Sequence, residues 1–194
     1  EREKKLRGLI FLGGRSDYTE AEIALLNVPF VCCAYTNSYG NLKSSQYSSV
    51  SVEDEQTAYQ AVQELYRLGH RRIAALISEV DDRAVSELRY HGYLRALKEH
   101  GLPLDERLVA CAGDFSMPSA YRGTQELLRR GGDFTALFCI SDSMAIAAMR
   151  ALEDAGRSVP KHCSVIGIDG LEMSEYTNPR LLRDRFLFRI PGPP

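Results

Sequence analysis

The sequence predicts an α/β fold in which helices cover both faces of an open, doubly wound parallel sheet. Apolar strand-like runs alternate along the chain with segments of helical period. The runs are continuously apolar, as expected for strands that are buried on both faces. This β-α-β order favours parallel pairing with crossover helices. The six predicted strands are residues 8–12, 29–34, 72–78, 108–112, 136–140 and 163–168.

The helices between these strands are indicated by the spacing of apolar residues. Three segments place such residues at positions i, i+3, i+4 and i+7, which share one face of a helix. A glycine follows each segment, at Gly69, Gly101 and Gly156, where helices commonly end. The three stripes are Ala58, Ala61, Val62 and Leu65; Tyr90, Tyr93, Leu94 and Leu97; and Ala145, Ala148, Met149 and Leu152.

The order of these segments also suggests a domain organisation. The 194 residues suffice for one good-sized domain or two small ones. A polar loop over 36–49 separates the first two strands from the rest, and two strands make a poor sheet alone. We therefore expect 1–69 to form an incomplete first lobe and 70–181 to form a second lobe. The tail 182–194 has no clean period and has no place in this pattern.

Composition argues against several classes of partner. The net charge of −2 and the pI near 6.1 give no general attraction to nucleic acid or to anionic membranes. No apolar run is long enough to span a bilayer, and the first residues lack the pattern of a secretory signal. The five cysteines are odd in number and form no C-x-x-C pair. We expect reduced cysteines, packed as small apolar residues, in a cytoplasmic protein.

Polar residues follow the carboxyl ends of four of the predicted strands. Ligands of open α/β sheets bind beyond these ends, so the residues form a candidate ligand site. Phe115 adds an apolar surface beside them. The polar candidates are Asp81, Asp82, Arg83, Arg89, Asp114, Ser141, Asp142 and Asp169.

Arg89 and Asp169 each have two interpretations. Arg89 lies near the start of a predicted helix, where it either donates to ligand oxygens or forms a salt bridge with an acid such as Asp82 or Glu87. Asp169 ends the stretch "CSVIGIDG", in which Gly167 lets another group approach closely. Because "DG" is a strong turn signal, Asp169 is either a turn residue or an acceptor for a ligand.

Two interpretations also remain for each of three further residues, namely Ser141, Asp142 and Phe115. Either Ser141 or Asp142 can cap the helix that follows, which leaves the other free for a ligand. Phe115 is either a core residue or a platform for a ligand.

Signatures of catalysis and of metal binding are missing from the sequence. The four histidines have no metal-ligand spacing with cysteines or acids. No G-x-S-x-G elbow, Walker loop or G-x-G-x-x-G motif follows a strand. We expect no enzyme activity, no metal site and no cofactor.

An ordered series of motifs runs from about residue 8 to residue 181. It includes "LGHRRIA", "R-x-x-G-Y" and "SDSMAIAAMRALEDAG" followed by "SVIGIDG". The series resembles the ligand-binding core of the lactose-repressor (LacI) family of bacterial transcription regulators. The resemblance implies a type I periplasmic-binding-protein-like fold of two doubly wound lobes, the first incomplete here. It also implies that a small effector, a sugar or a purine-like metabolite, binds between the lobes.

The resemblance further implies which residues contact the effector. Many family members have Asn where Ser141 stands. The acid of the family's "VDN" motif falls on Glu53 in "VEDEQ", with Asp54 beside it, and which of the two faces the ligand is left open. The implied ligand contacts are Arg89, Asp169, Phe115, Ser141, Arg83 and Glu53.

The function that the resemblance implies is that of the effector-binding and dimerisation core of a homodimeric regulator. Effector binding would close the lobes about hinge segments, one of them after Asp169, and so control operator binding by the full-length protein. Operator DNA would be reached only through a helix-turn-helix domain that this sequence lacks. The opening strands of the first lobe and the family's threonine-rich strand after "NPRL" are also missing. We expect a chain truncated at both ends, with an aberrant tail.

An alternative is a periplasmic sugar-binding protein of an uptake system. The five unpaired cysteines and the missing secretory signal argue against it.

Overall fold

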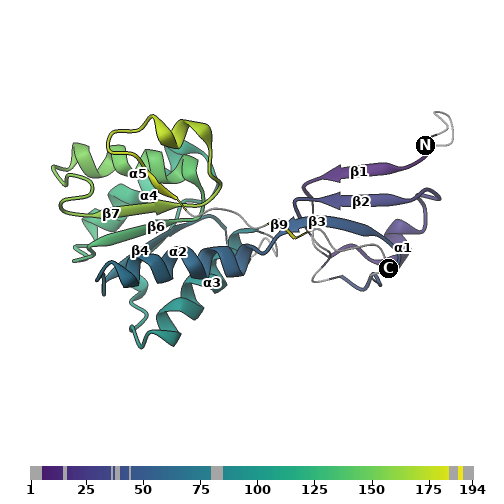
Figure 1. Ribbon diagram of the computed structural model, residues 1–194, viewed down its shortest axis with the longest axis horizontal. Helices are drawn as coiled ribbons and strands as arrows, with labels where there is room; N and C mark the ends of the chain where they lie inside the picture. The colour runs from purple at the N-terminus through teal and green to yellow at the C-terminus, as the bar shows by residue number, and fades with distance from the viewer. Residues whose placement is uncertain are drawn as a thin grey trace. The chain divides into compact units, whose positions relative to one another are not determined.

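The computed structural model describes residues 6–14, 17–35, 37, 40–43, 45–79, 85–183 and 188–189 (Figure 1). The chain divides into two compact units. Unit 1 comprises residues 1–53, 82–85 and 187–194, and unit 2 comprises residues 54–81 and 86–186. The boundary thus lies at Asp54, one helix before the expected boundary at residue 69.

Unit 1 is a four-stranded sheet with the order β1-β2-β3-β9. Its first three strands, β1 (Leu9–Leu12), β2 (Phe30–Cys33) and β3 (Ser48–Val52), are parallel, and β9 (Phe188–Arg189) pairs antiparallel with β3. The short helix α1 (Glu20–Ile23) lies between β1 and β2. The sheet carries a small aromatic core around Phe30, Cys32 and Tyr35.

The prediction of a polar loop over 36–49 is wrong at its C-terminal end, because strand β3 begins at Ser48. This strand reads Ser-Ser-Val-Ser-Val and is only partly buried. An alternation of serine and valine is typical of a strand with one half-exposed face, and it carries a weaker signal than the continuous runs elsewhere.

Unit 2 is a five-stranded parallel sheet with the order β5-β4-β6-β7-β8. Helices α2 and α3 lie on one side of this sheet, and α4 and α5 lie on the other (Figure 1). The predicted parallel α/β architecture is confirmed. The elements in chain order are α2 (Asp54–Arg67), β4 (Ile73–Ile77), α3 (Val85–Glu99), η1 (Glu106–Leu108), β5 (Val109–Cys111), α4 (Met117–Arg129), β6 (Ala136–Cys139), α5 (Asp142–Asp154), β7 (Ser164–Gly167), η2 (Glu172–Glu175) and β8 (Leu182–Arg183).

The core of unit 2 lies between the sheet and its helices. Leu65 of α2, Tyr93 of α3 and Leu152 of α5 are all buried, so each predicted apolar stripe faces this core. Such burial is the main favourable term in folding. No helix among the described residues is long and apolar enough to cross a bilayer.

The free cysteines follow the expectation only in part. Cys32, Cys139 and Cys163 are buried, and burial raises the pKa of Cys163 to about 12, so its thiol stays neutral. Cys111, in contrast, is exposed, because it ends β5, which lies at the edge of the unit 2 sheet.

The tail takes part in both sheets. Leu182 and Arg183 form β8, which pairs parallel with β7, and Phe188 and Arg189 form β9 of unit 1. The rest of the tail lies outside the described residues.

Candidate functional site

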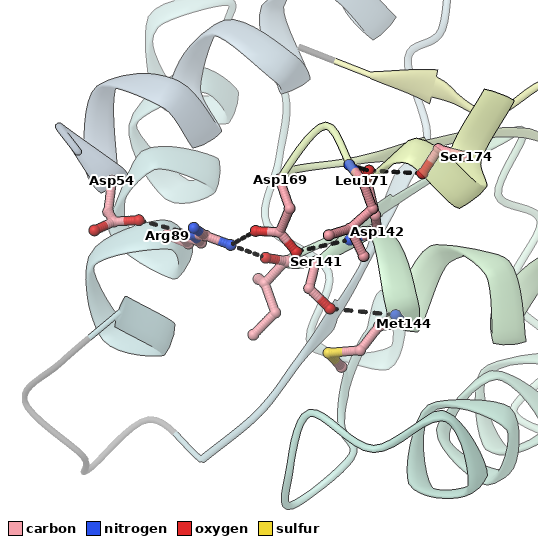
Figure 2. A network of polar contacts seen from close by, with 9 residues as sticks. Asp54, Arg89, Ser141, Asp142, Met144, Asp169, Leu171 and Ser174 are labelled. Carbon is pink, nitrogen blue, oxygen red and sulfur yellow. Dashed lines mark hydrogen bonds and ion pairs between the residues drawn. The ribbon is translucent and has the colours of Figure 1, made fainter. Parts of the chain in front are cut away.

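A network of charged and polar groups lies at the carboxyl edge of the unit 2 sheet (Figure 2). Arg89 of α3 stands at its centre, between Asp54 of α2 and the turn that follows β7. Ser141 and Asp142 follow β6 and begin α5. Parallel strands end at a common edge, so segments far apart in sequence meet there.

Arg89 is held by three acceptors. Its Nε donates to Asp54 Oδ1 at 2.8 Å, and its Nη1 donates to Asp169 Oδ1 at 3.1 Å and to the carbonyl oxygen of Ile140. The side chain is only 8% exposed. Arg89 thus forms ion pairs, but the observed partners are Asp54 and Asp169, whereas Asp82 and Glu87 were the acids expected. Asp169 is also the residue that was predicted to bind a ligand.

Helix packing explains how Arg89 reaches this position. Arg89 lies on the buried face of α3, one turn before Tyr93. Gly92 on that helix faces the backbone of α2, and a Cβ atom there would lie 2.7 Å from the Cβ of Ala58. The glycine of "R-x-x-G-Y" therefore allows α3 to approach α2 closely, and this approach brings Arg89 to Asp54.

Asp54, the acid that stands beside Glu53 in the motif, is an ion-pair partner of Arg89. Its side chain is 6% exposed and lies in the first turn of α2, where the helix dipole favours an acid. Glu53, by contrast, is exposed and belongs to unit 1. The structure brings Asp54, rather than Glu53, into contact with Arg89.

Asp169 combines an unusual backbone with a partly exposed carboxylate. Its φ of 146° lies in a region that residues with side chains rarely adopt. Its Oδ2 accepts the N–H of Asp142 at 3.2 Å, while 29% of the side chain remains exposed. Burial raises the pKa of Asp169, and the guanidinium of Arg89 partly offsets the rise. Strain of this kind is often retained at functional sites.

Ser141 and Asp142 are both engaged in local structure, which corrects the expectation that one of them is free. Ser141 is the N-cap of α5, and its Oγ accepts the N–H of Met144 at 3.2 Å. Asp142 Oδ2 accepts the N–H of Leu171 at 2.8 Å and the hydroxyl of Ser174 at 2.7 Å. The Ser141 hydroxyl and the Oδ2 atom of Asp142 thus each have protein partners.

Phe115 lies in the segment between β5 and α4, and its ring is not in the core. The residue is 39% exposed, which excludes the core interpretation. The neighbouring Asp114 accepts the N–H of Ser116 at 2.9 Å, and hydrogen bonds from Ser116 lower the pKa of this carboxyl. Arg83, Asp81 and Asp82 lie outside the described residues.

Two features of the network were not predicted from the sequence, namely Asp54 as the partner of Arg89 and the carbonyl of Ile140 as an acceptor. An acid at the first turn of a helix with a strong apolar stripe is a signal for a cap, and it does not reveal a distant arginine. Within the described part of the chain, no group of three or more histidines, cysteines and acids could hold a metal ion.

The chain matches the family described as periplasmic binding protein-like domain over residues 43–181. It is 35% identical over 181 residues to the HTH-type transcriptional regulator MalR of Clostridium butyricum, across 93% of this chain and 53% of that protein. It is 41% identical over 140 residues to the regulator AscG of Escherichia coli (strain K12), across 72% of this chain and 41% of that protein. The chain thus spans about half the length of the curated relatives it matches.

Solved structures agree with these relatives. The transcriptional regulator CelR in complex with cellobiose has a TM-score of 0.80 and 32% identity, across 93% of this chain and 54% of that one. A sugar-binding transcriptional regulator of the LacI family from Escherichia coli, complexed with phosphate, has the same TM-score and identity, across 93% and 63%. These relatives are transcriptional regulators, which favours the regulator interpretation over the alternative of a periplasmic uptake protein. The chain belongs to the periplasmic binding protein-like domain family, and the proteins to which it is similar are LacI-family transcriptional regulators.

Proposed function

We propose that this chain is the effector-binding and dimerisation core of a transcriptional regulator, and that its effector is a sugar bound at the carboxyl edge of unit 2. The observation that carries the proposal is the pair of Arg89 and Asp169. Arg89 is anchored from behind by Asp54 and by the carbonyl of Ile140, while the carboxylate of Asp169 remains partly exposed. Such an arrangement holds a charged acceptor in place before a ligand arrives.

The chemistry of this edge suits a polyhydroxylated ligand. An ionised carboxylate accepts hydrogen bonds from hydroxyl groups, and these charge-assisted bonds are stronger than neutral ones. Phe115 offers an exposed aromatic face for the apolar side of a sugar ring. The relatives support a sugar over a purine-like metabolite, because one of them was solved with cellobiose and another is described as sugar-binding.

Calorimetric titration tests this proposal directly. The chain is titrated with cellobiose, with a panel of other disaccharides and with purines. We expect a dissociation constant in the micromolar range for at least one sugar, and a loss of at least about tenfold in Asp169→Asn, since each lost charged hydrogen bond contributes about 1.5–3 kcal/mol. Binding of purines alone, or sugar binding that ignores Asp169, would show that the proposed site is wrong.

Phe115 has a matched control on the neighbouring helix. Met117 has the same 39% exposure, so Phe115→Ala and Met117→Ala remove similar exposed apolar groups. We expect only Phe115→Ala to weaken sugar binding, by about 1 kcal/mol or about fivefold. Equal losses of sugar affinity in the two variants would show that Phe115 is not a platform for the ligand.

We further propose that the regulator is a homodimer and that unit 2 supplies part of the contact. Exposed apolar residues gather in and after η2, namely Met173 (47% exposed) and Tyr176 (80% exposed). A groove of about 500 Å³ lies beside them, lined by Ile146 and Met149 of α5 and by Thr177–Pro179. Exposed apolar surface next to a groove is typical of a protein interface.

Sedimentation analysis tests this surface. Met173→Asp is expected to weaken self-association, whereas Leu104→Asp, at an equally exposed residue far along the chain, is not. Equal association states for both variants and the unaltered chain would exclude this surface as the dimer contact.

The remaining parts of the proposal concern the longer protein. We propose that units 1 and 2 correspond to the two lobes of the family fold, and that the effector controls operator binding through a DNA-binding domain of the full-length regulator. We also propose a cytoplasmic location and no catalytic activity. The regulator names of the relatives support these statements.

A further inference from the structure

Asp142 is a buried carboxylate that the proposed ligand contacts do not use. It is 0% exposed and lies in the first turn of α5. Its Oδ2 accepts two hydrogen bonds, but its Oδ1 has no hydrogen-bond partner among the described residues. Burial of an incompletely paired carboxylate is unfavourable, so this residue calls for a functional explanation.

The contacts of Asp142 enclose the turn at Asp169 from both sides. Before the turn, its N–H donates to the carbonyl of Ile168 at 2.8 Å and lies 3.2 Å from Asp169 Oδ2. After the turn, its carboxylate accepts from the N–H of Leu171 and the hydroxyl of Ser174 (Figure 2). One residue therefore fixes the backbone on either side of the strained Asp169.

Gly167 of β7 is the residue that admits Asp142 to this position. A Cβ atom at Gly167 would lie 2.5 Å from Asp142 Oδ1 and 3.0 Å from Asp142 Cα. The close approach that the glycine of "IGIDG" predicted is thus the approach of Asp142, and the partnerless Oδ1 faces it.

The same contacts continue into the segment after the turn. The carbonyl of Ser174 accepts the hydroxyl of Thr177 at 3.0 Å and the N–H of Leu181 at 3.3 Å. Leu181 directly precedes β8, and the exposed Tyr176 lies between these anchors. Asp142 therefore connects the turn at Asp169 to the whole segment 171–181.

We propose that Asp142 is the positioning residue of this site. Its carboxylate holds the Asp169 turn in the geometry that presents the Asp169 carboxylate, and it makes the positions of Asp169 and of η2 depend on one another. A ligand that binds Asp169 therefore also changes the position or the stability of η2. The statement rests on the proposed function only in taking Asp169 as a ligand contact.

Hydrogen exchange compares three variants of the chain. Asp142→Ala removes the acceptor, whereas Asp142→Asn keeps one oxygen for Leu171 and Ser174. Leu152→Ala is the matched control, because it weakens the core of the same helix without touching the turn. We expect the amides of 169–176 to exchange at least about tenfold faster in Asp142→Ala, and Asp142→Asn to restore most of the protection.

Exchange that rises equally throughout the chain in Asp142→Ala and Leu152→Ala would overturn the proposal, because Asp142 would then be a stabilising residue only. If Asp142→Ala does not fold, Ser174→Ala removes one of the two bonds and is expected to give the same local pattern to a smaller degree. Uniform exchange in that variant would also contradict the proposal.

Titration with cellobiose tests whether Asp142 also matters for ligand binding. In the unaltered chain, cellobiose is expected to slow exchange in 169–176, and Asp142→Ala is expected to bind it at least about tenfold more weakly than Leu152→Ala does. Unchanged affinity in Asp142→Ala would overturn the positioning role. If the unaltered chain does not bind cellobiose, the choice of that sugar fails, while the exchange comparison still decides whether Asp142 holds the turn.

Discussion

The two edges of the unit 2 sheet are built on opposite principles. The carboxyl edge carries the buried charges of Arg89, Asp54 and Asp142, together with the strained Asp169. At the amino edge, the ring of His70 bridges two hydroxyls, with Nδ1 2.9 Å from Thr135 Oγ1 and Nε2 3.0 Å from Ser164 Oγ.

The difference between the edges has a physical consequence. Hydroxyl partners can donate or accept, so the amino edge is satisfied whichever ring nitrogen of His70 holds the proton. Charged partners at the carboxyl edge depend on one another, because the loss of one leaves another buried without its counter-charge. We therefore expect the amino edge to serve stability and the carboxyl edge to serve binding.

The largest expected effect is that of Arg89→Ala. It leaves the buried Asp54 without its counter-ion, so we expect a loss of about 3–5 kcal/mol in the free energy of unfolding, measured by urea denaturation. Arg72→Ala at the amino edge is the control, because Arg72 is about half exposed, and its loss is expected to be below about 1 kcal/mol. Adding Asp54→Asn to Arg89→Ala should recover part of the stability, and a failure to do so would contradict the charge explanation.

The second largest expected effect is that of His70→Ala at the amino edge, which should change stability without changing binding. His70→Ala leaves the hydroxyls of Thr135 and Ser164 without their bridging ring, and we expect a loss of about 1–3 kcal/mol in the free energy of unfolding. The affinity for the effector should stay within about twofold, because His70 lies at the opposite edge of the sheet. A large loss of affinity in a folded His70→Ala variant would break the proposed division of roles.

Asp169→Gly should separate stability from binding. Relief of the φ strain favours the folded state by about 1–3 kcal/mol, and the added freedom of glycine in the unfolded chain opposes this by about 0.5–1 kcal/mol. Both Asp169→Gly and Asp169→Ala lose the ion pair with Arg89, so we expect Asp169→Gly to be about 0–2.5 kcal/mol more stable than Asp169→Ala, with sugar binding lost in both, measured by denaturation and calorimetry. Asp169→Ala, which keeps the strain, should be the less stable of the two variants.

The smallest effect is the pH dependence, which should have opposite signs at the two edges. Burial lowers the pKa of His70 below its ordinary value of 6.5, so the unfolded chain binds the proton first and stability falls as pH drops below 6.5. Burial raises the pKa of Asp169 above its ordinary value of 3.8, so the folded chain keeps its proton longer. Its contribution to stability is therefore lost as pH rises from 3.8 through the raised pKa.

Unfolding free energies of the unaltered chain, His70→Asn and Asp169→Asn over pH 4–8 test these signs. Relative to His70→Asn, the unaltered chain should lose unfolding free energy as the pH falls below 6.5. Relative to Asp169→Asn, it should lose unfolding free energy as the pH rises from the acidic end of the range. Differences of the same sign for both variants would contradict the contrast between the edges.

The fold was largely predictable because its signals are local. Continuous apolar runs predicted β4, β5, β6 and β7 of unit 2 and both early strands of unit 1, and apolar stripes predicted α2, α3 and α5. The strand β3 was missed, because its alternating serines and valines lie in a polar context. The short strands β8 and β9 have two residues each, which is too little for any periodic signal.

The site was predictable only as a set of candidates. The rule that ligands bind beyond strand ends selected Arg89, Ser141 and Asp169 among other polar residues, with Phe115 beside them, and the family resemblance kept these four as implied ligand contacts. Neither could show that Ser141 is used as a cap or that Asp54, rather than Glu53, pairs with Arg89. Those outcomes depend on which helix faces which, a property that sequence spacing does not contain.

The sequence by itself determined the α/β class, the core-facing stripes, and the glycine in "IGIDG" that needs a close neighbour. These are consequences of backbone periodicity and of side-chain size, which act within a few residues. Only the tertiary structure decided who the neighbours are. Arg89 meets Asp54 across 35 residues and Asp169 across 80, because the close packing of α3 on α2 and the common edge of the parallel strands bring them together.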